Sequence, residues 1–164
     1  MSMEPFERVV AEHGAVVLRV CRALLGSVDA DDAWSETFLA AMRAYPELRP
    51  DSNVRAWLVT IAHHKAIDQL RAAGRGPVPT SGLPEQVTSI GVPDAVADAD
   101  GDALRVALDT LSPKQRGAVV AHHLGGLPYR EVAELLECSE AAARRNAADG
   151  IAALRRTYGK GGGR

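Results

Sequence analysis

A stretch dense in helix-breaking residues divides this chain into two parts and limits what it can fold into. Between residues 76 and 99 the sequence contains the run GPVPTSGLPEQVTSIGVPD, in which proline or glycine recurs every few positions. Proline removes a helical hydrogen bond and glycine lowers helix propensity, so this segment is predicted to be an extended tether. It separates two predicted helical parts, residues 5–75 and 100–158. The glycine-rich tail, 159–164, is predicted to be disordered.

The composition favours helices in both parts. Apolar residues make up 46% of the 164 residues and aromatic residues only 4%, so a core must be built from Ala, Val, Leu and Ile. An alanine-rich sequence with few alternating apolar runs is typical of α-helix. Small lobes with few aromatic residues bury little surface, and each would be marginally stable alone. We therefore expect an all-α fold of two small helical lobes.

The first part predicts three helices. The first ends at Gly26 and is followed by a turn at residues 27–29. Asp31 and Asp32 open the second helix, where their carboxylates oppose the positive end of the helix dipole. A third helix is expected over residues 54–73. The apolar positions that support these helices are Phe6, Val9, Val10, Val17, Val20 and Leu24 in the first, Phe38, Leu39 and Met42 in the second, and Val54, Trp57, Leu58 and Ile61 in the third.

The second part predicts a helix-turn-helix. The run Ser112-Pro113-Lys114-Gln115 is a helix start with an N-cap, a proline at the first helical position and a capping box. That helix is expected to reach Leu124 and to end at the two glycines that follow. A short helix at 129–137, a tight turn at 138–139 and a longer helix over 140–158, capped by Ser139, then give the helix-turn-helix layout.

Charge alone leaves nucleic-acid binding open. The chain carries a net charge of −2, but from Gly101 onward ten basic residues face seven acidic ones. Arg144 and Arg145 lie early in the second helix of the predicted helix-turn-helix, where a recognition helix meets bases and phosphates. Arg130, at the start of the supporting helix, is placed to contact phosphate. The alternative is a plain helical hairpin whose arginines are only solvated.

Enzymatic and metal-binding functions find little support. The sequence has no GxSxG motif, no glycine-rich phosphate loop and no arrangement of Cys and His with a third partner. The pairs His63–His64 and His122–His123 are adjacent residues that point about 100° apart on a helix, whereas metal ligands on one helix need i, i+3 or i, i+4 spacing. Cys21 and Cys138 form no CxxC pair. We expect no enzyme and no cofactor, with a histidine metalloenzyme as the remaining alternative.

The sequence gives no sign of membrane targeting. Acidic residues interrupt the N-terminal segment, which lacks a charged-then-apolar leader. No window approaches the roughly 18 apolar residues that a transmembrane helix needs. We expect a cytoplasmic protein with no membrane insertion.

Two runs carry a resemblance to a known family. The sequence DADDAWSETFLAAMRAYPELR, followed by NVRAWLVTIAHHKAIDQLR, resembles region 2 of the extracytoplasmic-function (ECF) sigma factors of bacterial RNA polymerase. The run LDTLSPKQRGAVVAHHLGGLPYREVAELLECSEAAARR resembles their region 4. The two blocks occur in the family's order and, with the tether, cover nearly the whole chain.

The resemblance implies a function in transcription initiation. In this family region 2 docks on the clamp helices of the polymerase and opens the minus-10 promoter element. Region 4 binds the polymerase flap and reads the minus-35 element. The implied partners are core RNA polymerase, promoter DNA and an anti-sigma factor, with no cofactor.

The resemblance also assigns residues to sites by position. The helix that would dock on polymerase contains Asp32, Ser35, Glu36 and Phe38. The loop over residues 46–53 matches the segment that captures a flipped promoter base, where Asp51 and Asn53 would supply hydrogen bonds. The helix that would face minus-10 DNA contains Arg55, His63, His64, Lys65, Asp68 and Arg71. The expected minus-35 contacts are Arg130, Arg144 and Arg145.

Departures from the family pattern support a second reading. Ala33, Trp34 and Ser35 replace the usual Leu, Val and Gln of the docking helix. In the recognition helix, Ala147 replaces a core leucine, Asp149 would be repelled by phosphate, and Gly150 costs about 1 kcal/mol of helix propensity relative to alanine. The changes in the recognition helix predict altered minus-35 recognition. They make a sigma-like adaptor or regulator, which binds polymerase or another partner without reading a minus-35 element, the alternative function.

Overall fold

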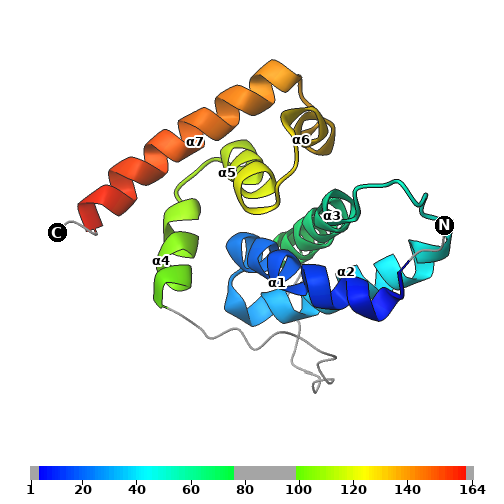
Figure 1. Ribbon diagram of the computed structural model, residues 1–164. Helices are drawn as coiled ribbons and strands as arrows, with labels where there is room; N and C mark the ends of the chain where they lie inside the picture. The colour runs from blue at the N-terminus through cyan, green and yellow to red at the C-terminus, as the bar shows by residue number, and fades with distance from the viewer. Residues whose placement is uncertain (1–3, 76–98, 162–164) are drawn as a thin grey trace.

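The computed structural model describes residues 4–75 and 99–161, and every regular element in those ranges is helical (Figure 1). The expected all-α fold is confirmed. We call residues 4–75 lobe 1 and residues 99–161 lobe 2. The predicted tether, apart from Ala99, and the last three residues of the predicted tail lie outside the described residues. In chain order the elements are α1 (Phe6–Leu25), α2 (Ser27–Ala44), η1 (Tyr45–Glu47), α3 (Val54–Arg75), α4 (Ala99–Leu108), α5 (Pro113–Val119), η2 (Val120–Leu124), α6 (Tyr129–Leu136) and α7 (Glu140–Gly161).

Lobe 1 is a bundle in which α1, α2 and α3 each pack against the other two. Its centre is aromatic. The Trp34 ring is 1% exposed and lies 4.6 Å from the Phe38 ring, measured between centroids. The indole Nε1 of Trp34 donates a hydrogen bond of 2.9 Å to the carbonyl of Gly14 on α1, which satisfies its polar atom inside the core. Trp57, expected in the core, is half-buried at its edge.

The connection between α1 and α2 is a single residue. Gly26 has φ of +89°, a conformation that L side chains rarely adopt, so the chain turns there without a longer loop. Its N–H donates to the carbonyl of Arg22, and its carbonyl accepts from the N–H of Ala30. The expectation of a turn at residues 27–29 is therefore wrong, because these residues already form the first turn of α2. Asp29 rather than Asp31 is the acidic residue of that turn.

The helix starts of lobe 2 follow the predicted capping chemistry. The Ser112 hydroxyl accepts from the N–H of Gln115, and the Gln115 side chain accepts from the N–H of Ser112, so the capping box is confirmed. The Ser139 hydroxyl accepts from the N–H of Ala142 and caps α7. Between these helices, Glu137 adopts φ of 59° and ends α6. The helix-turn-helix is thus formed by α6 and α7, and α7 extends three residues beyond the predicted end at 158.

The helix that begins at Pro113 changes its winding before it ends. After Val119 it continues as η2, a π-helical segment in which the N–H of Gly125 donates to the carbonyl of Val120, five residues back. The segment ends before Gly126, whose φ is +80°. The predicted extent of this helix is confirmed, but its wider last turn was not predicted. Such π segments occur frequently at functional sites.

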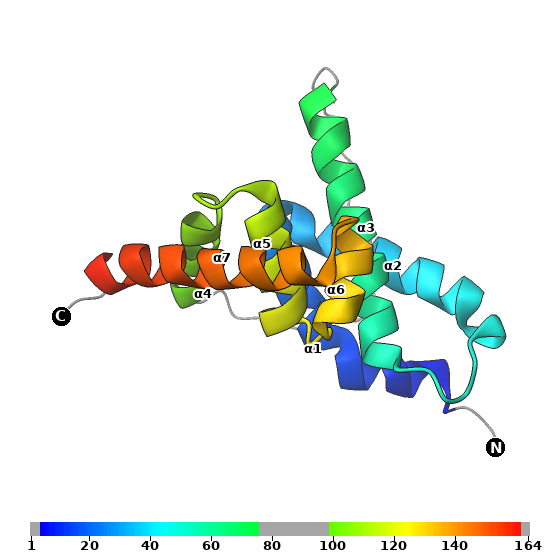
Figure 2. The same cartoon turned by 90° about the horizontal axis from the view of Figure 1, so that it is seen from above.

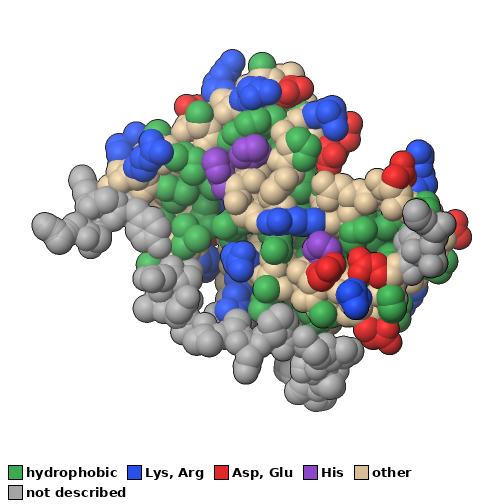
Figure 3. Space-filling model, in the orientation of Figure 1, with side chains coloured by type: hydrophobic (Ala, Val, Ile, Leu, Met, Phe, Trp, Pro, Cys, Tyr) green, Lys and Arg blue, Asp and Glu red, His purple; other side chains and the backbone are tan. Residues whose placement is uncertain are grey.

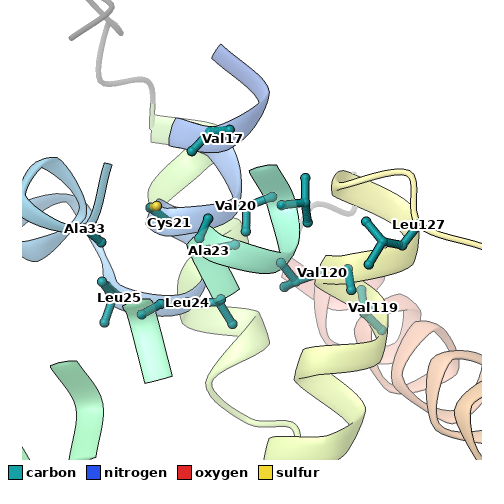
Figure 4. Close-up of a cluster of buried hydrophobic side chains, with 14 of the residues drawn as sticks. Val17, Val20, Cys21, Ala23, Leu24, Leu25, Ala33, Val119, Val120 and Leu127 are labelled. Carbon is teal, nitrogen blue, oxygen red and sulfur yellow. The ribbon is translucent and has the colours of Figure 1, made fainter. Parts of the chain in front are cut away.

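The two lobes share one hydrophobic core. Val20 and Leu24 of α1 lie beside Val120 of η2 and Leu127, and all four side chains are buried (Figure 4). In both views α6 lies over α3 (Figures 1 and 2). The packing is tight at Gly125, where an added Cβ would lie 2.6 Å from Val59 Cγ1 on α3. Whether the lobes pack together was left open by the sequence, and in this structure they do.

Small residues let the helices of lobe 2 approach closely. A Cβ added to Gly150 on α7 would lie 2.6 Å from Val119 Cγ2 on α5. Ala147, one turn earlier on α7, is fully buried. Both residues looked like defects of the recognition helix in the sequence, but in the structure they form the contact face of α7.

No helix in the two described ranges is both long enough and apolar enough to span a membrane.

Candidate partner and nucleic-acid interfaces

An apolar groove lies on the outer side of lobe 1 between α1 and α2. It encloses about 310 Å³. Leu39 and Met42, predicted to support α2 from its apolar side, are 43% and 50% exposed and line the groove. Exposed apolar side chains grouped in this way mark a surface for a partner. The complete lining is Phe6, Glu7, Val10, Trp34, Ser35, Phe38, Leu39 and Met42.

Two of the four predicted polymerase-binding residues, Ser35 and Phe38, line this groove. The other two, Asp32 and Glu36, are exposed on α2. The Glu36 carboxylate lies 3.9 Å from Lys65 Nζ on α3, a loose ion pair. The groove therefore has an apolar floor on a helix that also carries exposed carboxylates, which suits a partner with an apolar ridge and basic flanks.

The predicted minus-10 residues of α3 fall on two different faces. His64, Asp68 and Arg71 follow i, i+4 and i+7 spacing and are all exposed. The C-terminal end of α3 projects beyond the rest of the molecule (Figure 2). Lys65 is half-buried.

His63 lies on a different face of α3, about 100° around the helix from His64, and packs against lobe 2. Its side chain is buried, and its Nε2 lies 3.4 Å from the position that a Cβ on Gly117 would occupy. Its Nδ1 has no hydrogen-bond partner within the described residues. Burial and, secondarily, the neighbouring His64 lower the pKa of His63 from 6.5 to about 4. In this arrangement His63 is a neutral interface residue that is 5% exposed.

The loop before α3 is held by its own polar side chains. The Asn53 side-chain oxygen accepts a 3.1 Å hydrogen bond from the N–H of Ala56 and so caps α3. Asp51 lies 3.7 Å from Arg49, and both are exposed. Arg55 is exposed but extends toward lobe 2, where its guanidinium lies 3.4 Å from an ideal Cβ on Gly126.

The three predicted minus-35 residues lie on the helix-turn-helix. Arg130 is exposed and lies 4.0 Å from Glu131 on the same helix. Arg144 donates a 2.9 Å hydrogen bond to Glu140. Arg145 is also exposed.

Sequence reasoning missed two side chains at this site. Tyr129 stacks on His122 with 3.8 Å between ring centroids, and the guanidinium carbon of Arg144 lies 4.8 Å from the Tyr129 centroid. Partial burial, with His122 nearby, lowers the pKa of His123. The sequence signal that could have identified this site was an aromatic residue, Tyr129, at the first position of α6. Nothing in the sequence indicated that His122 of η2 would lie beneath it.

The histidine pairs do not assemble a metal site. Within residues 4–75 and 99–161, no three His, Cys, Asp or Glu side chains come together as a metal ion needs. Cys21 and Cys138 are both free. Burial and the nearby Asp31 raise the pKa of Cys21 to about 12, so this thiol remains protonated and serves the core.

Comparisons with known proteins agree on one family. Residues 9–76 match the family model for sigma-70 region 2, and residues 101–154 match the model for sigma-70 region 4. The ECF RNA polymerase sigma factor SigL of Mycobacterium tuberculosis is 33% identical over 154 residues, which cover 89% of this chain and 84% of that relative. SigE of Mycolicibacterium smegmatis is 30% identical over 82% of this chain.

This chain spans about half the length of SigE, since the match covers 54% of that relative. Among solved structures, the fold is similar to the sigma factor RpoE of Bartonella quintana in complex with the anti-sigma factor NepR. The TM-score is 0.69 at 20% identity, and the match covers 92% of this chain and 94% of that one. Two region models in the family's order and a relative matched over most of both chains establish that this protein belongs to the ECF sigma factors of the sigma-70 family.

Proposed function

We propose that this chain binds core RNA polymerase and directs promoter-specific transcription initiation. The observation that carries the proposal is the pairing of a region 2 lobe, which has an apolar groove, with a region 4 lobe, which ends in a helix-turn-helix. The ECF sigma factor family is non-enzymatic, and its place of action is the cytoplasm, where we place this chain as well.

The groove of lobe 1 is the polymerase-docking surface in this proposal. Its support is chemical. Leu39, Met42 and Phe38 give an apolar surface large enough for side chains of a partner helix. Asp32 and Glu36, exposed on the same helix, would add attraction to a basic partner and so increase the association rate more than the affinity.

The exposed face of α3 and the helix-turn-helix of lobe 2 are the DNA-contacting surfaces. His64, Lys65, Asp68 and Arg71 are candidates for minus-10 DNA, with Asp51, Asn53 and Arg55 at the start of the helix. Arg130, Arg144 and Arg145 are candidates for minus-35 DNA. Because Asn53 already caps α3, its side chain would contact a flipped base only by sharing or exchanging that bond.

Promoter binding by both lobes requires them to separate. The minus-10 and minus-35 elements lie about 25 base pairs apart, which is roughly 80 Å along B-form DNA. Lobes that share a hydrophobic core do not span that distance. The segment 76–98 has a maximum reach of roughly 80 Å, enough to keep the separated lobes connected. His63 would become available to DNA only in the separated state.

An anti-sigma factor is a further proposed partner. The similar Bartonella quintana structure is a complex of a sigma factor with such a protein, and the apolar groove of lobe 1 would suit a helix from either polymerase or an inhibitor. The two partners would then compete for one surface.

The adaptor alternative rests on the unusual recognition helix. The burial of Ala147 and Gly150 weakens it, because these residues support packing and are not lost DNA contacts. Asp149, exposed on α7, is the feature that still favours it.

Run-off transcription with purified core polymerase on genomic promoter fragments tests the proposal. We expect transcripts that depend on this chain, and Met42→Glu should abolish them by placing a charge in the groove. Val28→Glu is the matched control, because Val28 is on the same helix, is 89% exposed and lies outside the groove. Co-purification with polymerase without transcripts would favour the adaptor. Neither binding nor transcripts would contradict both readings.

A further inference from the structure

Three side chains from three separate elements of lobe 2 form a continuous stack. His122 of η2 lies parallel to Tyr129, the first residue of α6, with 3.8 Å between centroids and 15° between planes. On Tyr129 lies the guanidinium of Arg144 from α7, 4.8 Å from the ring centroid. Figure 3 shows histidine side chains over α5, close to apolar and basic side chains of the same lobe. The stack joins the π segment to the recognition helix.

The base of the stack is fixed by the backbone. His122 Nδ1 lies 2.8 Å from the carbonyl oxygen of Leu127, and because a carbonyl only accepts, this nitrogen carries the proton and donates. The wide turn of η2 is followed by the positive φ of Gly126, and Pro128 then enters α6 with extended backbone. The imidazole therefore has a defined tautomer and orientation, and Tyr129 rests on a rigid surface.

The top of the stack is held from two directions. Arg144 Nη2 donates a 2.9 Å hydrogen bond to the Glu140 carboxylate, one turn earlier on α7, while the guanidinium carbon lies over the Tyr129 ring. The neighbouring Arg145 has neither an ion pair nor an aromatic partner among the described side chains. Of two adjacent arginines on the recognition helix, one is thus held in place and the other is not.

We propose that Tyr129 and His122 are positioning residues that hold Arg144 ready to contact minus-35 DNA. The inference rests on the proposed promoter-reading function and adds two residues that neither sequence reasoning nor the family match assigned. A planar guanidinium binds phosphate or a guanine edge through a fixed fork of donors, so it loses less freedom on binding if its plane is already oriented. Stacking leaves the guanidinium N–H groups that are not bonded to Glu140 free to donate.

The same stack has a purely structural explanation, which makes a different prediction. If Tyr129 only joined α6 to η2, its loss would destabilise lobe 2 and lower activity on every promoter equally. If it positions Arg144, its loss matters only when Arg144 and an upstream DNA element are both present. The two explanations separate in a double-mutant cycle measured on two promoters.

The experiment uses holoenzyme assembled from core polymerase and the full chain. Promoter affinity is measured by transcription titration on a promoter with its native minus-35 element and on the same promoter with that element scrambled. The variants are Tyr129→Leu, His122→Leu, Tyr129→Phe, Arg144→Ala and the double variant Tyr129→Leu/Arg144→Ala. Arg155→Ala, which removes an exposed arginine further along α7, controls for loss of charge.

On the native promoter we expect Tyr129→Leu to weaken affinity about three- to fivefold, the size of an exposed cation–π contact. His122→Leu should act in the same direction. Tyr129→Phe should keep the preference for the promoter with the native minus-35 element, since it keeps the aromatic face. In the Arg144→Ala background, Tyr129→Leu should add nothing, and on the scrambled promoter it should have no effect.

An equal effect of Tyr129→Leu on both promoters, or an undiminished effect without Arg144, would overturn the inference while leaving promoter reading intact. If Tyr129→Leu fails to fold, His122→Leu carries the same cycle. A wild-type chain that does not distinguish the two promoters would overturn the proposed minus-35 function, and the inference with it.

Discussion

The two lobes are built from different kinds of side chain. Lobe 1 contains both tryptophans and both phenylalanines of the chain, and its rings form a connected cluster through Phe6, Phe38, Trp34 and Tyr45. In lobe 2, Tyr129 is the only Phe, Tyr or Trp whose side chain the structure describes. Its helices meet instead through aliphatic side chains and small residues such as Gly117, Ala147 and Gly150.

This difference corresponds to how each lobe presents its surface. Large aromatic residues leave an apolar groove between α1 and α2, a surface suited to a protein partner. Small residues such as Gly117 and Gly150 bring helix backbones together and leave polar side chains on the outside. Lobe 1 thus gains its stability from a few large buried groups, and lobe 2 from close packing that tolerates little added volume.

The largest effect is expected from removing the central ring of lobe 1. Trp34→Ala should lower the free energy of unfolding by about 3–5 kcal/mol, because it leaves a cavity and removes the hydrogen bond that links the indole to the Gly14 carbonyl. Chemical denaturation measures the change. The exposed control Val28→Ala should change stability by less than about 0.5 kcal/mol. A loss below 1 kcal/mol for Trp34→Ala would show that lobe 1 does not depend on its aromatic centre.

The next largest effect concerns pH and the lobe interface. His63 has its pKa lowered from 6.5 to about 4, so the packed arrangement favours the neutral imidazole. The contribution of neutral His63 to the free energy of unfolding is complete above pH 6.5. It is lost as the pH falls toward 4, because the unfolded chain binds the proton more readily, and the total loss is about 3 kcal/mol. Stability measured between pH 7 and pH 4 should therefore fall less steeply in His63→Gln than in wild type. Identical slopes would contradict the buried position of His63.

A smaller effect is expected where Gly125 of lobe 2 packs against Val59 of lobe 1. Gly125→Ala places a methyl group 2.6 Å from Val59 Cγ1 and 2.9 Å from the Ala121 carbonyl, so it should destabilise the chain by about 1–3 kcal/mol. Val59→Ala shortens the opposing side chain, and the double variant should recover part of that loss. Denaturation of the two single variants and the double variant gives the coupling free energy. If the destabilising effects of Gly125→Ala and Val59→Ala simply add, the strain caused by the new methyl group lies within η2 and not between the lobes.

The smallest effect tests local helix chemistry in lobe 2. Ser112→Ala removes the hydroxyl that accepts from the N–H of Gln115, which should cost about 1 kcal/mol. Thermal unfolding followed by circular dichroism detects it. Glu134→Ala, at an exposed position of α6, is the control and should have a smaller effect. An equal loss in both would indicate that the cap contributes nothing beyond general surface effects.

Features set by local chemistry were predictable from the sequence. The capping box at Ser112, the cap at Ser139 and the helix-turn-helix depend on residues within a few positions of one another. A local error at residues 27–29 arose because a single glycine with positive φ replaces a three-residue turn.

Features set by contacts between distant segments were not predictable. Gly150 and Ala147 looked costly until α5 was placed against α7. His63 was assigned to DNA from its position in the family motif, and only the packing of α3 on lobe 2 shows it buried. The stack of His122, Tyr129 and Arg144 joins three elements whose relative orientation no periodicity encodes.

The central claim is that the lobes which share a core in the free chain work apart on a promoter. Energy transfer between dyes at Ala11→Cys on α1 and Ala152→Cys on α7, both exposed, tests it directly in a Cys138→Ser background. We predict strong transfer in the free chain and a marked loss when core polymerase and promoter DNA are added. Strong transfer that persists in an actively transcribing complex would contradict this account.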